Sequence, residues 1–177
     1  MKTHERILAS QIGLLPRSEL IGAEIGVWRG SLSAAMLRRF SGLFLVMVDP
    51  WKGSVPGLAG EDEVKQACIE AVSSTDFASD RRCVLRLTSE KASKIINDGS
   101  LDFVFIDALH DYENVALDIR LWFPKVKAGG LISGHDYNGR LDRSGAGGVK
   151  RAVDEFAGGN FHRVHSERIN WWFWKDK

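Results

Sequence analysis

The sequence predicts an α/β fold, in which a doubly wound, mostly parallel seven-stranded sheet carries an antiparallel strand near the C-terminus. Two observations support this prediction. Short apolar runs alternate with helical patterns over most of the 177 residues, and runs of about four to eight residues bounded by glycine, proline or aspartate are typical of strands buried on both faces. The last two strand-like runs are separated by only a few residues, which indicates a hairpin and therefore antiparallel pairing.

Five strands are expected before the hairpin, and helical patterns separate them. The strands are at residues 20–27, 43–49, 83–87, 101–107 and 129–136, and the helices at 31–40, 61–73, 89–97, 113–126 and 149–156. Ser31 and Ser89 are expected helix caps, while Pro124 should end or bend its helix near Trp122. Alternation of strands and helices implies right-handed parallel crossovers with helices on both faces of the sheet.

The C-terminal hairpin joins FHRVHS at residues 161–166 to INWWFWK at residues 169–175. By strand alternation, Trp172 and Trp174 share one face of the second run, and Trp171 and Phe173 share the other. A strand that is apolar on both faces fits a position between two neighbouring strands or beneath a partner chain. We expect these tryptophans to pack in the core rather than to recognise a ligand.

Composition and charge describe a single soluble globular domain that spans residues 1–177. A hydrophobic fraction of 44% suffices for a sizeable core. The net charge of +1 gives no electrostatic footprint for nucleic acid or an anionic membrane. No apolar run approaches the ~18–20 residues of a membrane span, and the polar start does not resemble a signal peptide, so we expect a cytoplasmic protein. The spacing of Cys68 and Cys83 matches no metal or redox motif, which favours reduced thiols.

Polar residues end five successive predicted strands. They are Glu24 with Gly26, Asp49, Thr88 with Ser89, Asp107, and His135 with Asp136. In open α/β sheets, ligands bind beyond the carboxyl ends of the strands, where the strand order reverses. A shared crevice explains five polar endings better than chance does.

The first strand–helix turn has the form G-x-x-x-G and not the G-x-G-x-x-G of dinucleotide-binding proteins. Gly26 would let a ligand approach the backbone, and Gly30 would let the chain turn tightly. The helix that starts at Ser31 would offer free N–H groups to a carboxylate or phosphate. For the glycines alone, a plain strand–helix turn is an equal alternative. Asp49 follows Gly26 by 23 residues, where an acid can accept both hydroxyls of a ribose; a structural cap of the next loop is the alternative.

Three segments carry a family resemblance: AEIGVWRGSLS, LVMVDPW and LDFVFIDALHDYENVALDIRLWFPKVKAGGLISGHDY. Together they resemble class I S-adenosylmethionine-dependent methyltransferases, and in particular the small group related to catechol-type and macrolide-sugar O-methyltransferases. The resemblance covers residues 23–156 and implies the Rossmann-like methyltransferase fold. Its first two segments occur in many methyltransferases, whereas the block from Asp107 to Asp136 is more specific.

The resemblance also implies how the cofactor would be bound. Glu24 and the turn after it would hold the methionine part, Asp49 the ribose hydroxyls, and Asp107 would lie beside the sulfonium. The residues implied to bind S-adenosyl-L-methionine are Glu24, Gly26, Val27, Trp28, Gly30, Ser31, Asp49, Trp51, Thr88, Ser89 and Asp107.

The same resemblance suggests how an acceptor hydroxyl would be activated, with His110 and Asp107 as the catalytic residues. His110 matches the general base of sugar O-methylating relatives; a solvated cap for the following helix is the alternative. Asp107, His135 and Asp136 match the metal ligands of metal-dependent relatives, which would bind Mg²⁺ or Mn²⁺. Those relatives usually carry a carboxylate or amide where His135 stands, so a softer ion than Mg²⁺ is favoured, or no metal binds and His135 contacts the backbone.

The leading hypothesis is therefore S-adenosylmethionine-dependent O-methylation of a small hydroxylated substrate, possible with or without a metal. An NAD(P)-dependent oxidoreductase and a non-catalytic cofactor-binding or interaction module are the alternatives. The chain has little beyond the core fold to enclose a substrate, so a second subunit in a homo-oligomer is expected to complete the pocket if the substrate is enclosed. Arg140 and Arg143 in the glycine-rich loop could meet an anionic substrate, although solvated loop charges are the commoner case. His4, His162 and His165 are expected to lie away from the crevice and are given no role.

Overall fold

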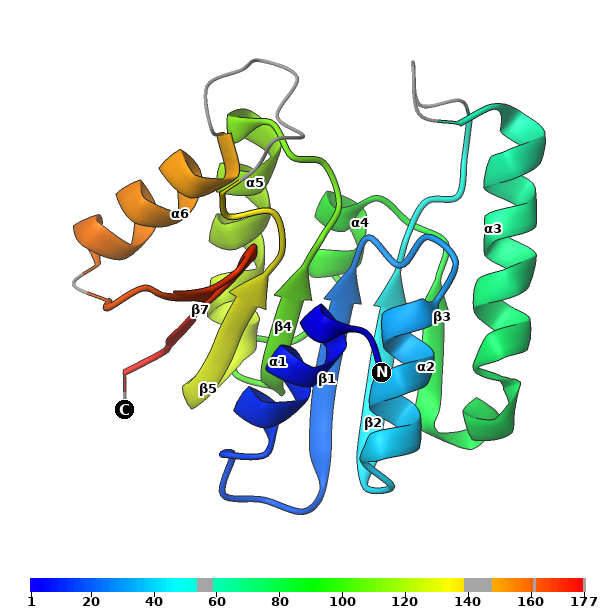
Figure 1. The fold of residues 1–177 in the computed structure, drawn as a ribbon, viewed down its shortest axis with the longest axis horizontal. Helices are drawn as coiled ribbons and strands as arrows, with labels where there is room; N and C mark the ends of the chain where they lie inside the picture. Colours follow the sequence, from blue (N-terminus) through cyan, green and yellow to red (C-terminus); the bar gives the residue numbers. More distant parts are fainter. Residues whose placement is uncertain (54–58, 139–147, 161, 177) are drawn as a thin grey trace.

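A seven-stranded sheet organises the molecule (Figure 1). The computed structural model describes residues 1–53, 59–138, 148–160 and 162–176. The strands are β1 (Leu20–Ile25), β2 (Leu43–Val48), β3 (Arg82–Leu85), β4 (Leu101–Ile106), β5 (Val126–Gly134), β6 (His165–Glu167) and β7 (Asn170–Trp174), in the order β3-β2-β1-β4-β5-β7-β6. β1 to β5 pair in parallel, whereas β7 is antiparallel to β5 and β6. The predicted fold class and the C-terminal hairpin are confirmed.

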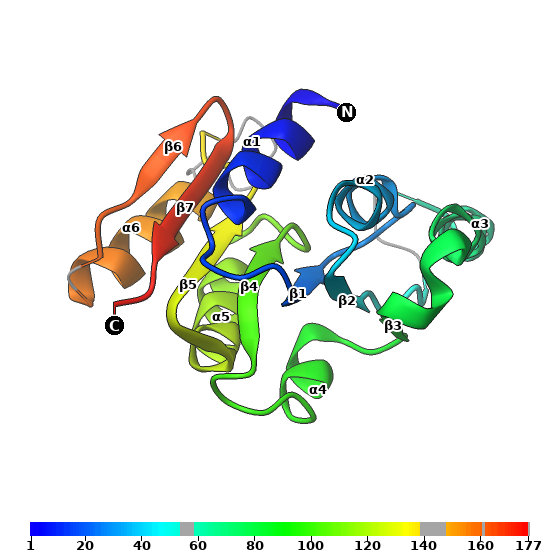
Figure 2. The same ribbon diagram turned by 90° about the horizontal axis from the view of Figure 1, so that it is seen from below.

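Helices cover both faces of this sheet (Figure 2). One face carries α1 (Thr3–Ile12), α2 (Ser31–Arg39) and α3 (Glu61–Ser74), and the other carries α4 (Ser89–Ser93), α5 (Tyr112–Trp122) and α6 (Gly148–Gly159). Short 3-10 turns at Asp76–Arg81 and Phe123–Lys125 precede β3 and β5. The strand order reverses between β1 and β4, so the carboxyl ends of these two strands mark the switch point at which ligands bind in such folds.

Local details of the helices both confirm and correct the sequence analysis. α5 ends at Trp122 and Pro124 lies in the following 3-10 turn, as predicted. Neither predicted serine cap is correct. Gly30, with a φ of 74°, precedes α2, and Ser31 is already helical; Thr88 caps α4 through its side-chain oxygen. Each serine is the first helical residue, one position after the N-cap, and its hydroxyl donates to a carboxylate elsewhere in the fold.

Helix α1 is an addition to the expected elements. From the sequence, this segment is expected to be only a polar and charged start. Leu8 and Ile12 are one helical turn apart, and both are buried in the core cluster on the α2 face of the sheet. This spacing is the signal of an amphipathic helix, and it is weak because the helix has only 10 residues.

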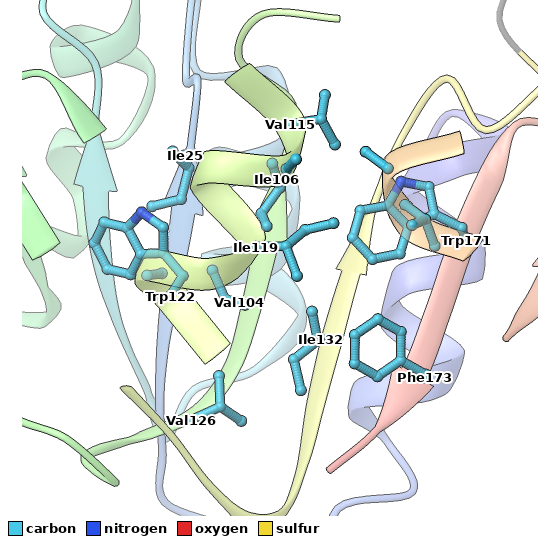
Figure 3. Close-up of a cluster of buried hydrophobic side chains, with 14 of the residues drawn as sticks. Ile25, Val104, Ile106, Val115, Ile119, Trp122, Val126, Ile132, Trp171 and Phe173 are labelled. Carbon is cyan, nitrogen blue, oxygen red and sulfur yellow. The ribbon is translucent and has the colours of Figure 1, made fainter. Parts of the chain in front are cut away.

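The C-terminal strand β7 packs on both of its faces. Trp171 and Phe173 are fully buried in the cluster beneath α5 and α6, and Figure 3 shows them beside Ile132 of β5. Trp172 and Trp174 pack against the cluster on the opposite face. The predicted division of faces is confirmed. Of the two positions expected for such a strand, the structure has the one between neighbouring strands, because β7 lies between β5 and β6.

Both cysteines are free thiols, with Cys68 buried and Cys83 half-buried. In the described part of the chain, none of the helices has the combination of length and apolar character that crossing a membrane requires.

A buried carboxylate fixes the amino-terminal end of the central strands. Asp102 in β4 is 1% exposed and accepts the backbone N–H of Ile21 at 2.8 Å. It also forms ion pairs with Arg17, which precedes β1, and with Lys127, whose Nζ is 2.9 Å from Oδ1. One acid thus joins β1, β4, β5 and the segment that leads from α1.

Replacing Asp102 by Asn should lower the free energy of unfolding by about 1–3 kcal/mol, because the two cations lose their counter-charge. Asp98→Asn is a matched control, since Asp98 pairs with Lys125 at an exposed position. The control should change stability by less than about 1 kcal/mol. Urea unfolding measures the stability of both variants. Equal losses of stability would show that Asp102 does not hold the strands together more strongly than an exposed ion pair does.

A second buried acid lies under α5. Asp118 is 5% exposed and accepts the hydroxyl of Ser89, which in turn accepts the indole N–H of Trp122 at 2.8 Å. Burial raises the pKa of Asp118 to about 6. The chain of hydrogen bonds fixes the start of α4 against α5.

Replacing Asp118 by Asn should change how stability depends on pH. The folded-state pKa of about 6 exceeds the ordinary 3.8, so the folded protein binds this proton more tightly than the unfolded chain. The wild type therefore loses up to about 3 kcal/mol of stability as the pH rises from about 4 to about 6. The variant keeps an oxygen acceptor without the charge, so its advantage should grow over this range and stay constant above it. Urea unfolding at several pH values checks this, and a pH-independent difference would contradict it.

Candidate functional site

The carboxyl ends of β4 and β5 bring two aspartates and a histidine together. Asp107 and Asp136 follow these neighbouring strands, whose last residues Ile106 and Gly134 are paired. The Nε2 atom of His110 lies 3.3 Å from Asp107 Oδ1 and 3.3 Å from Asp136 Oδ2. One side-chain ligand atom from each of these three residues lies within 4.8 Å of the others. The predicted proximity of the two carboxylates is thus present.

His135 lies beside this group. Its Nδ1 is 3.2 Å from Asp136 Oδ2 and 3.8 Å from Asp107 Oδ1. Its carbonyl oxygen accepts the indole N–H of Trp171 at 3.1 Å. The two carboxylates therefore have an imidazole on each side, from His110 and from His135. Among the described residues, the group of possible metal ligands whose atoms all lie within 4.8 Å of one another contains His110 and not His135, which was the third ligand predicted from the sequence.

The backbone at the site has left-handed conformations. Among the described residues, the non-glycine residues with positive φ are Trp28 (52°), Trp51 (38°), Asp136 (57°) and Arg168 (57°). Such conformations cost of order 1–3 kcal/mol and cluster at functional sites. Trp28, Trp51 and Asp136 all follow the carboxyl ends of sheet strands, so the strain is concentrated where the crevice is expected.

Opposite charges shift the pKa values of the cluster. The hydrogen bond with Asp107 raises the pKa of His110, against the effect of burial. Burial alone would lower the pKa of His135, but its hydrogen bond to Asp136 and the charge of Asp107 raise it. Burial would raise the pKa of Asp136, but its hydrogen bond to His135 and the nearby histidine charges lower it. Each carboxylate thus stabilises a proton on the neighbouring imidazoles.

His4 also lies at this site, which corrects the sequence analysis. Its ring centroid is 5.2 Å from that of His135, with an interplanar angle of 66°. Burial and the charge of His135 lower the pKa of His4. Recognition of α1 from Leu8 and Ile12 would have supplied the missing element, because His4 precedes Leu8 by one helical turn.

The turn after β1 is pressed against the end of β4. Gly26 has a φ of 89°, and a Cβ atom added there would lie 2.2 Å from the carbonyl oxygen of Asp107. A Cβ atom on Gly30 would lie 2.7 Å from the Cα atom of Ala71 in α3. Packing therefore accounts for both glycines without a ligand, and it places the turn directly beside Asp107. The Val27 side chain is buried in the core.

Asp49 joins this turn to the loop after β2. Its carboxylate accepts the backbone N–H of Trp28 at 2.9 Å and that of Trp51 at 2.8 Å. The indole N–H of Trp51 donates to the carbonyl of Trp28 at 2.8 Å. Burial raises the pKa of Asp49. The structural role considered for Asp49, as a cap of the loop that follows it, is present.

Two further carboxylates lie at the start of α2. Glu24 is 4% exposed and accepts the hydroxyl of Ser33, and burial raises its pKa to about 8. Ser31 donates its hydroxyl to Glu5 of α1 at 2.9 Å. A cation near Glu24 would favour its ionised form. Glu5 and Ser33 were missed from the sequence, because only the three-dimensional fold brings them to the turn.

The remaining predicted residues differ in their availability. The Thr88 side chain caps α4, and the Ser89 hydroxyl is engaged with Asp118 in the core. Arg140 and Arg143 lie outside the described residues. His165 stacks on Trp172 in the hairpin, with ring centroids 5.8 Å apart.

The carboxyl edge of the sheet carries groups that favour a cationic ligand, and His110 there can accept a proton. Four acidic residues lie at the carboxyl ends of β1, β2, β4 and β5: Glu24 is the next-to-last residue of β1, Asp49 and Asp107 directly follow their strands, and Asp136 follows β5 after one intervening residue. The Arg29 guanidinium in the first turn binds Glu70 at 2.7 Å, and thus pairs with α3. His110 has a side chain that is 27% exposed, so a ligand hydroxyl could reach it.

Comparisons with known proteins agree with this fold. A family model described as a methyltransferase domain matches residues 23–137. An O-methyltransferase from Bacillus cereus, solved in complex with SAH, is 17% identical with a TM-score of 0.72, over 100% of this chain and 82% of that chain. The O-methyltransferase NovP is 17% identical with a TM-score of 0.70, over 98% and 80%. A putative caffeoyl-CoA O-methyltransferase from Staphylococcus aureus is 12% identical with a TM-score of 0.73, over 99% and 84%.

The search of curated proteins found no match. At these identities the solved structures establish the fold, while the family model covers more than half of the sequence. The chain therefore belongs to the methyltransferase-domain family, among the class I S-adenosylmethionine-dependent methyltransferases.

Proposed function

We propose that this protein methylates a hydroxyl oxygen of a small substrate with S-adenosylmethionine, and that His110 is the general base. The position of His110 carries the proposal. Its Nε2 lies 3.3 Å from a carboxylate oxygen of Asp107 and of Asp136, at the edge of the sheet where this fold binds ligands. The O-methyltransferases with the same fold support the choice of an oxygen acceptor.

The charge of the crevice fits the cofactor. S-adenosylmethionine has a sulfonium and an ammonium group against one carboxylate, so it is a net cation. Glu24, Asp49 and Asp107 provide negative or ionisable groups along three strand ends, which favours a cation. Asp49 would accept the ribose hydroxyls, and the backbone around Gly26 would face the methionine part. The cofactor supplies an electrophilic methyl group, and the protein positions the acceptor in line with it, which can account for ~7–11 kcal/mol of the barrier.

His110 would accept the proton of the acceptor hydroxyl. A hydroxyl is a poor nucleophile until it loses its proton, and a positioned imidazole contributes about 10²–10⁴-fold to such a step. The flanking carboxylates of Asp107 and Asp136 stabilise the imidazolium that results. The proton thus moves from the acceptor oxygen to a ring nitrogen of His110.

The two carboxylates could also hold a divalent ion, although the described residues whose possible ligand atoms all lie within 4.8 Å of one another are Asp107, His110 and Asp136. Asp107 and Asp136 would hold it with His135 as a third ligand, which leaves His110 free as the base. Carboxylate and imidazole ligands together suit Mn²⁺, Fe²⁺ or Zn²⁺ better than Mg²⁺. Such an ion would lower the pKa of a bound hydroxyl and orient it.

Calorimetric titration with S-adenosylmethionine, and separately with NAD, tests the cofactor, each with and without Mn²⁺. We expect saturable binding of S-adenosylmethionine and none of NAD. At ~100 times the dissociation constant, the bound cofactor should add about 2.7 kcal/mol of stability, which raises the melting temperature by roughly 5–10 °C. Binding of NAD alone would favour an oxidoreductase, and the absence of S-adenosylmethionine binding would contradict the proposal.

Replacing His110 by Asn should separate an enzyme from a binding module. We expect the formation of S-adenosylhomocysteine with a panel of small phenols and sugar alcohols to fall about 10²–10⁴-fold. The dissociation constant for S-adenosylmethionine should change by less than about threefold, because His110 lies on the acceptor side. His165→Asn, in the hairpin, is the matched control and should retain turnover. Equal turnover in the two variants would remove His110 from the mechanism.

A further inference from the structure

The N-terminal helix α1 reaches the candidate site although it lies outside the residues matched by the family model, which begin at 23. It packs on the same face of the sheet as α2, and Figure 2 shows it between α2 and β7. Its first turn thus lies near the carboxyl ends of β1 and β5. This placement raises the question of what the first turn contributes.

Two polar contacts anchor this first turn. Glu5 is 4% exposed, and its Oε1 accepts the hydroxyl of Ser31 at 2.9 Å while its Oε2 accepts the backbone N–H of Lys2 at 2.6 Å. On the other side, the side-chain amide of Asn170 in β7 donates to the carbonyl of His4 at 3.2 Å. The first turn of α1 is therefore tied to α2 through the Glu5 side chain and to β7 through the His4 carbonyl.

The anchored turn presents the His4 ring edge-on to the ring of His135. The centroids are 5.2 Å apart and the planes are inclined by 66°, which is a favoured arrangement of two aromatic rings. Away from His4, the His135 backbone is fixed by Trp171, and its Nδ1 is 3.2 Å from Asp136 Oδ2. His135 thus has three separate contacts: its backbone carbonyl with Trp171, its ring Nδ1 with Asp136, and its ring with His4.

The ring of a histidine is not fixed by its own torsional preference. The χ2 torsion joins an sp³ to an sp² carbon, so its energy profile is broad and roughly two-fold. A half-turn of the His135 ring would move Nδ1 away from the two carboxylates and put a carbon there. The hydrogen bond between Nδ1 and Asp136 favours the observed half-turn, and packing by a neighbour limits how far the ring tilts away from it.

We propose that His4 is a positioning residue, which holds the His135 imidazole with Nδ1 toward Asp107 and Asp136. The role of His135 in acceptor activation rests on the proposed function, whereas the orientation of its ring does not. Helix α1 thus contributes a residue to the site. The surroundings of His135 come from His4, before the segment that the family model matches, and from Trp171, after it.

Nitrogen NMR of the histidine rings tests the orientation directly in metal-free protein labelled with ¹⁵N-histidine. The chain has five histidines, and a His135→Gln variant assigns the His135 signals. We expect His4→Ala to shift or broaden the His135 signals, while His4→Phe, which keeps an aromatic edge, retains them.

A second measurement is Mn²⁺ binding by calorimetry, which should weaken about 10-fold in His4→Ala. The dissociation constant for S-adenosylmethionine should change by less than about twofold.

His165→Ala is the matched control, because His165 also stacks on an aromatic residue but lies in the hairpin. It should leave the His135 signals unchanged. The proposal is wrong if His4→Ala leaves them unchanged, if His4→Phe disturbs them as strongly as His4→Ala does, or if the control has the same effect. If wild-type protein fails to bind S-adenosylmethionine, the proposed function fails, while the ring signals still decide the role of His4.

Discussion

The close contact between Gly26 and the carbonyl of Asp107 is the constraint on which both halves of the site depend. It occurs where the strand order reverses, and the N–H of Asp107 donates to the carbonyl of Ile25 at 2.8 Å beside it. A Cβ atom at Gly26 would lie 2.2 Å from the carbonyl oxygen, so any side chain would separate β1 from β4 there. The turn expected to face the cofactor and the acid expected to face the acceptor are consequently held at one fixed distance.

The sheet concentrates four acids at one edge, and they are accommodated in three different ways. Asp107 and Asp136 lie next to the imidazoles of His110 and His135. Asp49 accepts two backbone N–H groups, whereas burial keeps Glu24 largely protonated near neutral pH, with a pKa of about 8. The crevice can therefore remain acidic in composition without carrying the full repulsion of four adjacent charges.

The sequence predicts the architecture well because the regular alternation of short apolar runs with helical patterns, and the Asp107–Asp136 segment, carry strong local signals. It also predicts that these two carboxylates meet, since carboxyl ends of neighbouring parallel strands share an edge. It fails for His4, because a helix of 10 residues with few apolar positions has a weak pattern. The hydroxyls of Ser31 and Ser89 were misassigned for a different reason: their acceptors are 26 and 29 residues away in sequence, beyond any local rule.

The histidines distinguish this cluster from one built only of acids. When both His110 and His135 are protonated, their charges balance those of Asp107 and Asp136, so the cluster is neutral without any ion. A divalent ion on the carboxylates would have to replace at least one of these imidazolium charges. His110 cannot accept a proton and coordinate the ion through the same nitrogen. A neutral imidazole has one free lone pair, so, under the proposed function, a base and a metal ligand would have to be different imidazoles. The orientation of His135 would then matter as much as the position of His110.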